Sequence, residues 1–534
     1  MKYCSKTLLF TYLIFTVCTA DLISGDNFRI YPSPVTQTEP IVSISPVNPS
    51  IMFVSAVTIN TSNGFKSEGV YSSTNGGLNW FGSDSCKGAL ISNHGGDPAA
   101  IIDKNGHFIL NHIGSIFIGV YSHYSTDMGE TWSGAYVLTN QQPEDKGTAT
   151  TDGVPTSPYY GRSYASWVNF VSPFPVLVSY TTNSGVNWTN PLPINSPPPQ
   201  RSSGGDIKTG PNGHVYVAWS GVTGGVPYYE DYAGFGISNN GGVNWQIDQN
   251  IFDMNGINGT LPSKGNIRVN GLPRIAVDLS NSSKRGWIYI VTTEKNISPA
   301  GSDPDIILHR STNGGSTWSQ GIRVNQDALN NGKIQYFPAI SVDSSGAINI
   351  LYYDDRNTTS DSAEVYLSRS LNGGNTWSDF NISDNRFKPK AIAGGPSSYQ
   401  GDFISLASSG HNLFAYWMAD YTGTYQIWTS IIDWRTIGLR KISTEVPKEF
   451  ILKQNYPNPF NPSTNIEFSI PKSSQVKLVI YNSEGKEVAS PVNAALAPGT
   501  YRTSFDGTSL ASGVYFYRLI TQDVAVSKKM ILIK

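Results

Sequence analysis

An aspartate recurs at the same place in four Gly-rich segments of this sequence. The four segments are His94-Gly95-Gly96-Asp97, Thr151-Asp152-Gly153, Gly204-Gly205-Asp206 and Gln400-Gly401-Asp402. At corresponding places two further segments carry Arg274 and Tyr336, and Tyr399 lies close to the last aspartate. If these side chains meet, their carboxylates can bind sugar hydroxyls, hold a cation, or act as acid and base. The alternative is that each aspartate only accepts hydrogen bonds from the backbone of its own turn.

A second motif indicates what would bring these side chains together. The pattern Ser/Thr-x-Asn/Asp-x-Gly-x-x-Trp occurs six times, beginning at Ser73, Ser125, Thr181, Ser238, Ser311 and Ser370. Successive copies are 52 to 73 residues apart. Each copy follows an alternating strand pattern, so we interpret it as a hairpin turn in which Asn or Asp bonds the backbone and Gly takes a positive φ. Six such turns at near-regular spacing predict a repeat fold.

Seven pairs of apolar strands accompany these turns. The pairs cover residues 41–55, 98–110, 154–167, 206–219, 273–293, 338–353 and 402–417. Two inner strands, a third strand, the turn and a fourth strand make one propeller blade, and residues 27–31 are expected to supply the strand that the seventh unit lacks. We predict an all-β chain with a seven-bladed β-propeller over residues 27–434, with six blades as the alternative. The recurring acids would then line the mouth of the central channel.

The six-copy motif resembles the Asp box of the sialidase superfamily. Box residues fall at the blade rim, so we expect a structural role for Asn75, Trp80, Asp127, Trp132, Asn183, Trp188, Asn240, Trp245, Asn313, Trp318, Asn372 and Trp377. Ligand binding is instead expected at the channel mouth, from Asp97, Asp206, Arg274, Tyr336, Tyr399 and Asp402.

The resemblance to sialidases is weaker for catalysis. Members of that superfamily clamp the sialate carboxylate with three arginines and use a Tyr nucleophile, a Glu and an Asp acid. Phe28-Arg29-Ile30-Tyr31-Pro32 looks like the family's Arg-Ile-Pro motif with one residue inserted, while Arg162 and Arg356 are clamp partners by position only. No Tyr/Glu pair stands out. The catalytic candidates are therefore Asp97, Asp152, Asp206, Asp402, Arg29 and Arg274.

The last 84 residues differ from the repeats. Residues 435–450 have the composition of a linker, and residues 451–534 read as short alternating strands of a small Ig-like β-sandwich. The segment Tyr456-Pro457-Asn458-Pro459-Phe460, the strand from Ser512 to Tyr517 and the ending Lys528-Lys529-Met530 resemble the type A sorting domain of the type IX secretion system. The resemblance implies export across the outer membrane and contact between residues 451–534 and the secretion machinery.

The N-terminus and the composition fit an extracellular protein. Residues 1–20 have the charged start, apolar run and small-residue end of a signal peptide, and no later segment reaches the twenty apolar residues that a membrane span needs. The net charge of -2 argues against nucleic-acid binding, and we expect a monomer. No metal-ligand spacing is found. Calcium is the only cofactor considered, at Asp354-Asp355-Arg356 or Asp420, where ion pairs are the alternative.

Three functions remain open from sequence. The first is a secreted or cell-surface, sialidase-like propeller that binds glycan or polysaccharide at its channel mouth. The second is a glycoside hydrolase of the exo-sialidase type acting on extracellular glycans. The third is a protein-binding scaffold or adhesin, so the sequence leaves open whether the chain is an enzyme.

Overall fold

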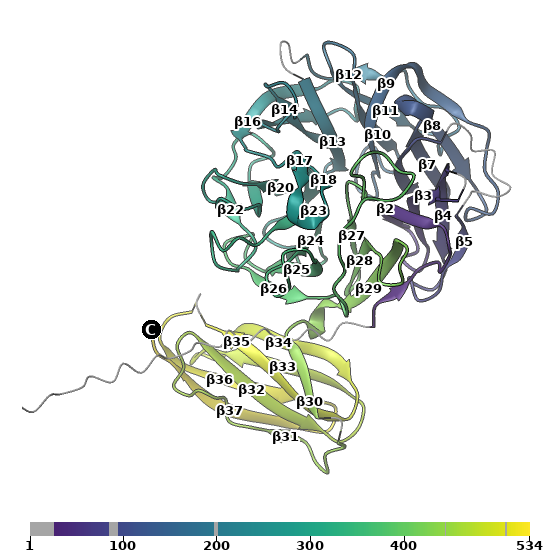
Figure 1. The fold of residues 1–534 in the computed structure, drawn as a ribbon. Helices are drawn as coiled ribbons and strands as arrows, with labels where there is room; N and C mark the ends of the chain where they lie inside the picture. Colours follow the sequence, from purple (N-terminus) through teal and green to yellow (C-terminus); the bar gives the residue numbers. More distant parts are fainter. Residues whose placement is uncertain (1–25, 63, 85–93, 197–200, 444, 508–509) are drawn as a thin grey trace, which may run out of the picture. The chain divides into compact units, whose positions relative to one another are not determined.

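The computed structural model describes residues 26–534 except 63, 85–93, 197–200, 444 and 508–509. The expected signal peptide and Cys86 lie outside the described residues. The described chain forms two compact units, one ending at Ile437 and the other running from Gly438 to Lys534 (Figure 1). Each unit is built from antiparallel strands, so the all-β prediction is confirmed.

The first unit contains five four-stranded sheets and one longer sheet that runs through two repeats. The four-stranded sheets are β2 (Thr36–Ile44), β3 (Met52–Asn60), β4 (Phe65–Ser73) and β5 (Phe81–Ser83); β13 (Arg201–Thr209), β14 (Val215–Val222), β15 (Tyr232–Ser238) and β16 (Gln246–Asp253); β19 (Arg274–Val277), β20 (Ile288–Glu294), β21 (Asp305–Ser311) and β22 (Ile322–Arg323); β23 (Gln335–Val342), β24 (Ile348–Asp354), β25 (Glu364–Ser370) and β26 (Ser378–Asn381); and β27 (Ser405–Ser409), β28 (Asn412–Ala419), β29 (Gln426–Asp433) and β1 (Phe28–Arg29). The longer sheet joins β6 (Gly96–Ile102), β7 (Phe108–Ile113), β8 (Ile118–Ser125), β9 (Tyr136–Thr151), β10 (Ser163–Asn169), β11 (Val176–Thr181) and β12 (Leu192–Pro193). Shorter elements of this unit are β17 (Gly259–Leu261), β18 (Ile267–Val269) and the 3-10 helices η1 (Ser115–Phe117), η2 (Pro262–Lys264) and η3 (Trp434–Thr436).

The inner strands of the repeats contact one another in a closed cycle. The order is β2, β6, β9, β13, β19, β23, β27 and back to β2. The long strand β9 serves twice, because its first part pairs with β8 and its last part pairs with β10. This cyclic arrangement is that of a β-propeller, and we interpret each of the seven inner strands as the start of one blade.

The N-terminal strand closes the ring. Phe28 pairs with Thr429 and Arg29 with Trp428, which places β1 as the outer strand beside β29. The closing role expected of residues 27–31 is therefore confirmed over the two residues of β1. Between neighbouring sheets apolar side chains interlock, as where Tyr289 of β20 packs with Ile348 and Tyr352 of β24.

The six repeated turns share two hydrogen bonds, one accepted by the Ser or Thr side chain and one by the Asn or Asp side chain. In the first, Ser73 Oγ accepts from the Gly77 N–H at 2.9 Å, Asn75 Oδ1 accepts from the Asn79 N–H at 3.0 Å, and the Trp80 indole donates to the Gly77 carbonyl at 2.9 Å. The bond from the N–H four residues on to the Asn or Asp side chain recurs in the other five turns. A turn needs only this acceptor, which is why Asn replaces Asp in five of the six copies.

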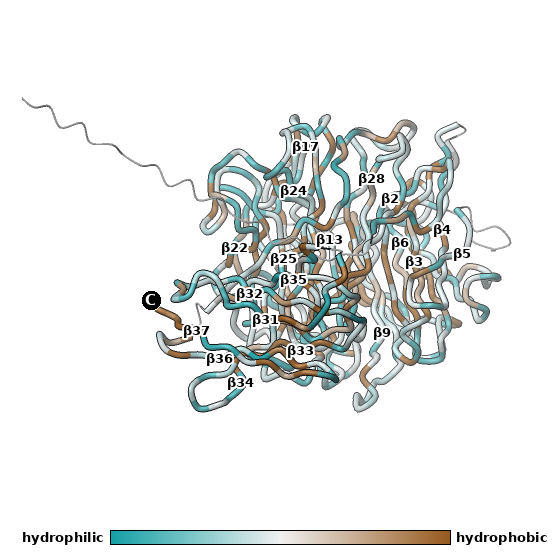
Figure 2. Tube along the Cα trace, turned by 90° about the horizontal axis from the view of Figure 1, so that it is seen from below, coloured by the Kyte–Doolittle hydropathy of each residue, from teal (hydrophilic) through white to brown (hydrophobic). Residues whose placement is uncertain are grey.

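The second unit is a sandwich of two four-stranded antiparallel sheets. One sheet contains β30 (Leu439–Ser443), β35 (Gly499–Asp506), β32 (Ser463–Ile470) and β31 (Ile451–Leu452), and the other contains β34 (Glu487–Leu496), β33 (Ser474–Tyr481), β36 (Gly513–Ile520) and β37 (Ala525–Leu532). Figure 2 shows brown, apolar stretches along strands such as β33 and teal, polar stretches in several loops. The expected linker differs from the structure in one respect: part of residues 435–450 forms β30, which pairs with β35.

Candidate functional site

Several inner strands have a bulge near their start. Glu39, Asp97 and Phe337 have φ values of 54°, 48° and 53°, each precedes a proline, and each lies at a register shift in its sheet. A bulge re-aims a side chain, and positive φ in residues other than Gly is concentrated at functional sites. Glu39 was not among the expected acids. The sequence pattern that could have identified Glu39 is an acid followed by Pro near the start of an inner strand, a pattern that Asp97 also has.

The negative charges of four carboxylates act on Arg274, whose guanidinium lies 5.0 Å from the centre of the Phe403 ring. Burial lowers the pKa of Arg274 overall, whereas the negative charges of Asp206, Asp97, Glu39 and Asp402 each raise it. These acids come from β13, β6, β2 and the segment before β27, so the four belong to four different inner strands or their starts. Asp206 also accepts from the Ile275 N–H at 3.1 Å, which ties its carboxylate to the strand of Arg274. The structure thus brings together three of the four predicted aspartates and Arg274.

A second arginine, Arg268 of β18, completes the cluster. Its Nε donates to Asp402 Oδ1 at 3.0 Å and its Nη2 donates to Asp402 Oδ2, and its guanidinium lies 4.7 Å from the centre of the Tyr399 ring. The Asp402 N–H donates to Glu39 Oε1 at 2.9 Å. Burial lowers the pKa of Arg268, but the charge of Asp402 and its hydrogen bonds outweigh burial and raise it. Burial raises the pKa of Tyr399 well above its ordinary value, so its hydroxyl stays protonated at neutral pH.

Arg268 reaches the mouth on a segment that crosses between distant sheets. This cross-channel segment, residues 254–272, follows β16 and precedes β19, and Figure 1 shows its strands β17 and β18 near the middle of the ring. The Arg268 N–H donates to the Ser398 carbonyl at 2.7 Å, and Asn270 Nδ2 donates to the Asp402 carbonyl at 3.1 Å. At its first turn, Lys264 Nζ contacts Asp355 in the loop after β24. The sequence signal for this segment is the 73-residue interval between the fourth and fifth boxes, the longest of the five.

Beneath the bulge of Asp97 lies a buried acid, Glu68 of β4. Its Oε1 accepts from the Gly96 N–H at 3.1 Å. Burial raises the pKa of Glu68 to about 8, with the nearby charge of Asp97 adding to that effect. Glu68 is therefore a protonated carboxylic acid at neutral pH, next to an inner-strand aspartate. Sequence reasoning missed it because nothing in the strand pattern separates it from an outward-facing polar residue.

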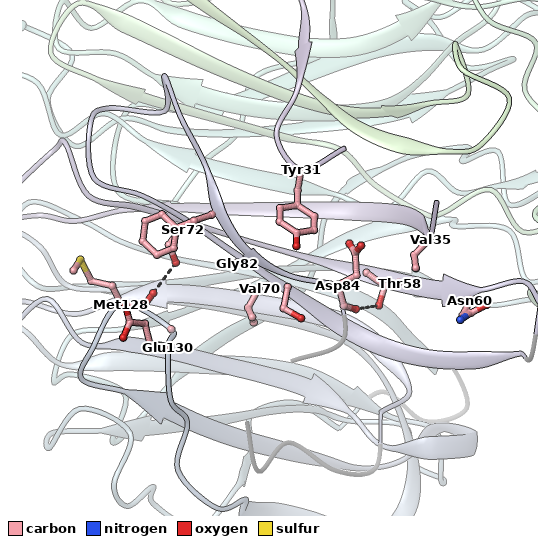
Figure 3. Close-up of a pocket in the computed structure, with 13 residues that line it drawn as sticks. Tyr31, Val35, Thr58, Asn60, Val70, Ser72, Gly82, Asp84, Met128 and Glu130 are labelled. Carbon is pink, nitrogen blue, oxygen red and sulfur yellow. Dashed lines mark hydrogen bonds between the residues drawn. The ribbon is translucent and has the colours of Figure 1, made fainter. Parts of the chain in front are cut away.

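The open space at the mouth is small. A pocket of about 30 Å³ is lined by Glu39, Asp97, Arg268, Tyr399 and Asp402, among others. That volume holds about one water molecule. A larger cavity of about 620 Å³ lies elsewhere, beside β4 and β5, and Figure 3 shows Tyr31, Asp84, Thr58 and Glu130 among its lining residues.

Asp152 does not join the cluster. It follows β9 at the opposite end of the inner strand, is fully buried, and accepts hydrogen bonds from the Val154 N–H at 3.1 Å and from the Ser157 hydroxyl. It belongs with the turn aspartates that follow the inner strands of other sheets, namely Asp103, Asp278 and Asp343. The structure therefore supports the alternative for Asp152, in which it accepts hydrogen bonds within its own turn.

Tyr336 and Arg29 also lie away from the mouth. Tyr336 is fully buried, with its ring centre 5.1 Å from that of Phe337 and 5.0 Å from that of Tyr353, so it is part of the core. Arg29 lies on the outer strand β1, over the Trp428 ring at 5.9 Å. The predicted ligand-binding role of Tyr336 and the predicted catalytic role of Arg29 are therefore corrected. Arg29 belongs to the strand that closes the ring.

The two other arginines considered as clamp partners, Arg162 and Arg356, bind partners elsewhere in the propeller. Arg162 donates to the Gly241 carbonyl at 2.6 Å, and Arg356 pairs with Asp354 at 2.7 Å and with Asp379 at 2.5 Å. The residues considered for calcium are held in ion pairs, since Asp355 contacts Lys264 and Asp420 lies 2.5 Å from Lys390. Within the described part of the chain, no group of three or more His, Cys, Asp or Glu side chains is placed to hold a metal ion.

Comparisons with known proteins identify only the C-terminal unit. Residues 454–534 match the family described as the secretion system C-terminal sorting domain. No curated protein matches this sequence. In the described ranges no helix has the length and apolar character that crossing a membrane requires.

Several solved structures are similar in fold. A polysaccharide lyase, PL25 ulvan lyase, is 13% identical over 76% of this chain and 96% of its own, with a TM-score of 0.47. The α-L-arabinofuranosidase Arb93A from Fusarium graminearum is 12% identical over 63% and 92%, with a TM-score of 0.39. PorZ, a surface component of the type-IX secretion system of Porphyromonas gingivalis, is 10% identical over 93% and 70%, with a TM-score of 0.29. None of these likenesses is close enough to carry over an activity. The closed cycle of inner strands and the family match together show that this chain is a β-propeller protein with a type IX secretion sorting domain at its C-terminus, exported to the cell surface or beyond.

Proposed function

We propose that this exported propeller binds an extracellular glycan or polysaccharide at its channel mouth, without the catalysis of known sialidases. The observation that carries the proposal is the group of Glu39, Asp97, Asp402 and Arg268 around one pocket, where Arg268 pairs with Asp402 and the Asp402 N–H donates to Glu39. Carboxylates and guanidinium groups offer many hydrogen-bonding positions to sugar hydroxyls, and they stand where a propeller's inner strands begin. The ring of Tyr399 lines the same pocket, with the Arg268 guanidinium 4.7 Å from its centre.

The same geometry argues against a sialate clamp. Both arginines of the mouth are compensated, Arg268 by Asp402 and Arg274 by the surrounding acids. A sialate carboxylate would have to displace an internal carboxylate or be repelled by it. The alternative that the site is an exo-sialidase therefore has the weaker support.

A second candidate, hydrolysis of some other glycoside, is favoured by one observation. Glu68 is protonated at neutral pH and lies close enough to Asp97 for the charge of Asp97 to raise its pKa. A protonated acid beside a carboxylate is the pairing that glycosidases use, although Glu68 itself is fully buried beneath the bulge.

Replacing Asp402 tests both candidates. Asp402→Asn removes one partner of Arg268 and one of the four acids around Arg274, so we expect glycan affinity to fall about tenfold or more, the cost of a charged hydrogen bond. Binding is measured on a glycan microarray, and turnover by fluorophore release from a fluorogenic α-sialoside and from neutral glycosides. Binding that weakens without any turnover supports the binding proposal, whereas turnover abolished in the variant establishes a hydrolase.

The matched control is Asp248→Asn, because Asp248 is exposed on the outer strand β16. It should bind and unfold like the wild-type protein. If wild-type protein retains only protein ligands in a pull-down and no glycan on the array, the scaffold alternative replaces the proposal.

A further inference from the structure

Arg201, the first residue of β13, is a cation with no carboxylate partner in the described part of the chain. Its guanidinium lies over three aromatic rings, 4.4 Å from Tyr228, 4.6 Å from Phe170 and 5.6 Å from Phe174. Its Nε is buried and has no hydrogen-bond partner among the residues that the structure describes. The adjacent residues 197–200 are Pro-Pro-Pro-Gln and supply no acid. The charge of this guanidinium is therefore not compensated by a described residue, and an anionic group of a ligand could pair with it.

The loop beside Arg201 is fixed, and its acids are engaged elsewhere. Asn258 Nδ2 donates to the Pro227 carbonyl at 2.7 Å and to the Tyr228 carbonyl at 3.0 Å. Asp231 accepts from the backbone and hydroxyl of Thr223, both at 2.6 Å. Glu230 accepts from the backbone N–H groups of Gly271 at 2.9 Å and Asn258 at 3.1 Å. Neither acid is therefore the partner that Arg201 lacks.

Two exposed aromatic side chains lie beside Arg201 and a second cation, Lys295. Tyr228 and Tyr229 are 38% and 43% exposed. Lys295 Nζ lies 5.8 Å from the centre of the Tyr229 ring. Exposed rings offer apolar faces on which a sugar can pack, and the planar fork of Arg matches a carboxylate or a sulfate group.

We propose that Arg201, Tyr228, Tyr229 and Lys295 form a subsite for a carboxylated or sulfated sugar of an acidic polysaccharide. The subsite rests on the proposed glycan-binding function and names the chemical class of the glycan. It lies toward the same end of β13 as the channel mouth, since Asp206 follows Arg201 by five residues, at most about 17 Å at about 3.3 Å per residue. One polysaccharide chain can span both places.

The test measures retardation of the full exported chain in native gels that contain a soluble polymer. The polymers are polygalacturonate, which carries carboxylates, a carrageenan, which carries sulfates, and dextran, which is neutral. We expect wild-type protein to be retarded by one or both acidic polymers, with retardation that falls as salt rises. Arg201→Gln should weaken this binding at least about tenfold, Lys295→Gln should weaken it less, and Tyr229→Ala should weaken binding with less change in salt dependence.

The matched control is Arg285→Gln, because Arg285 is exposed and its guanidinium contacts only backbone carbonyls such as that of Ser280. Thermal unfolding of each variant separates lost binding from lost folding, and Lys295→Gln reports on the subsite even if Arg201→Gln unfolds. Equal retardation of wild-type and Arg201→Gln proteins, equal retardation by dextran, or no retardation by any polymer would overturn the subsite. Asp402→Asn tests the channel mouth separately. If Asp402→Asn loses binding on the microarray and Arg201→Gln does not, the proposed function stands without the subsite. If Arg201→Gln loses binding and Asp402→Asn does not, the subsite stands without a role for the mouth.

Discussion

The Glu68→Gln variant is expected to be more stable than the wild-type protein, by an amount that grows with pH. The pKa of Glu68 is raised to about 8 in the folded state, chiefly by burial, whereas in the unfolded chain the side chain ionises near its ordinary pKa of 4.5. Between these values the unfolded state releases a proton that the folded state keeps, so stability falls as pH rises. At about 1.4 kcal/mol for each pKa unit, the penalty is small near pH 4.5 and reaches about 4 kcal/mol at pH 8.

Glutamine removes this penalty because it has the shape of the protonated acid and does not ionise. Its side-chain oxygen can still accept the bond from the Gly96 N–H. The measurement is urea unfolding between pH 4.5 and pH 8, followed by tryptophan fluorescence. All 12 tryptophans lie at or before Trp434, so the signal reports on the propeller unit alone.

Glu130→Gln serves as the control, since Glu130 is exposed. It should show no trend with pH relative to wild type. A stability difference for Glu68→Gln that stays constant from pH 4.5 to pH 8 would mean that Glu68 is already ionised in the folded protein, and the protonated acid beside Asp97 would be lost as support for hydrolysis.

The features that sequence predicts best in this protein are those set by local chemistry. The turn around Asn75 depends on side chains within seven residues of one another, so its residue types alone indicate its hydrogen bonds. The closing strand at Phe28 was predictable for a different reason: a sheet with an unpaired edge at β29 requires a partner, and the N-terminal segment had the matching pattern.

The site was predictable only in part, because its contacts are long-range. The Gly-rich segments indicated Asp97, Asp206 and Asp402. Asp152 stands in a similar segment, but it follows the end of its inner strand, whereas the other three lie toward the starts of theirs. The continuous strand β9 hides that boundary, since it serves two sheets without a break. Arg268 could not be assigned from sequence, because its partner Asp402 is 134 residues away and is reached only by the cross-channel segment.

The cross-channel segment leads to the second large effect, in the Lys264→Met variant. The side chains of Lys264 and Asp355 are both fully buried and form an ion pair, and Lys264 Nζ also donates to the Ser362 carbonyl at 2.9 Å. Methionine fills much of the same space but leaves the charge of Asp355 buried without a cation. We expect the free energy of unfolding to fall by about 3 to 5 kcal/mol, measured by the same fluorescence-detected urea titration.

The double variant Lys264→Met/Asp355→Asn separates charge from packing. It should recover part of the loss, because asparagine can still accept the Ile334 N–H bond that Asp355 accepts at 2.7 Å while carrying no charge. Lys388→Met is the matched control, since Lys388 and Asp361 form an exposed pair and such pairs contribute little to stability. If Lys264→Met costs no more than Lys388→Met, the Lys264 pair does not anchor the segment. Arg268 would then owe its position at the mouth to its own bonds with Ser398 and Asp402, and Asp402→Asn alone should release it.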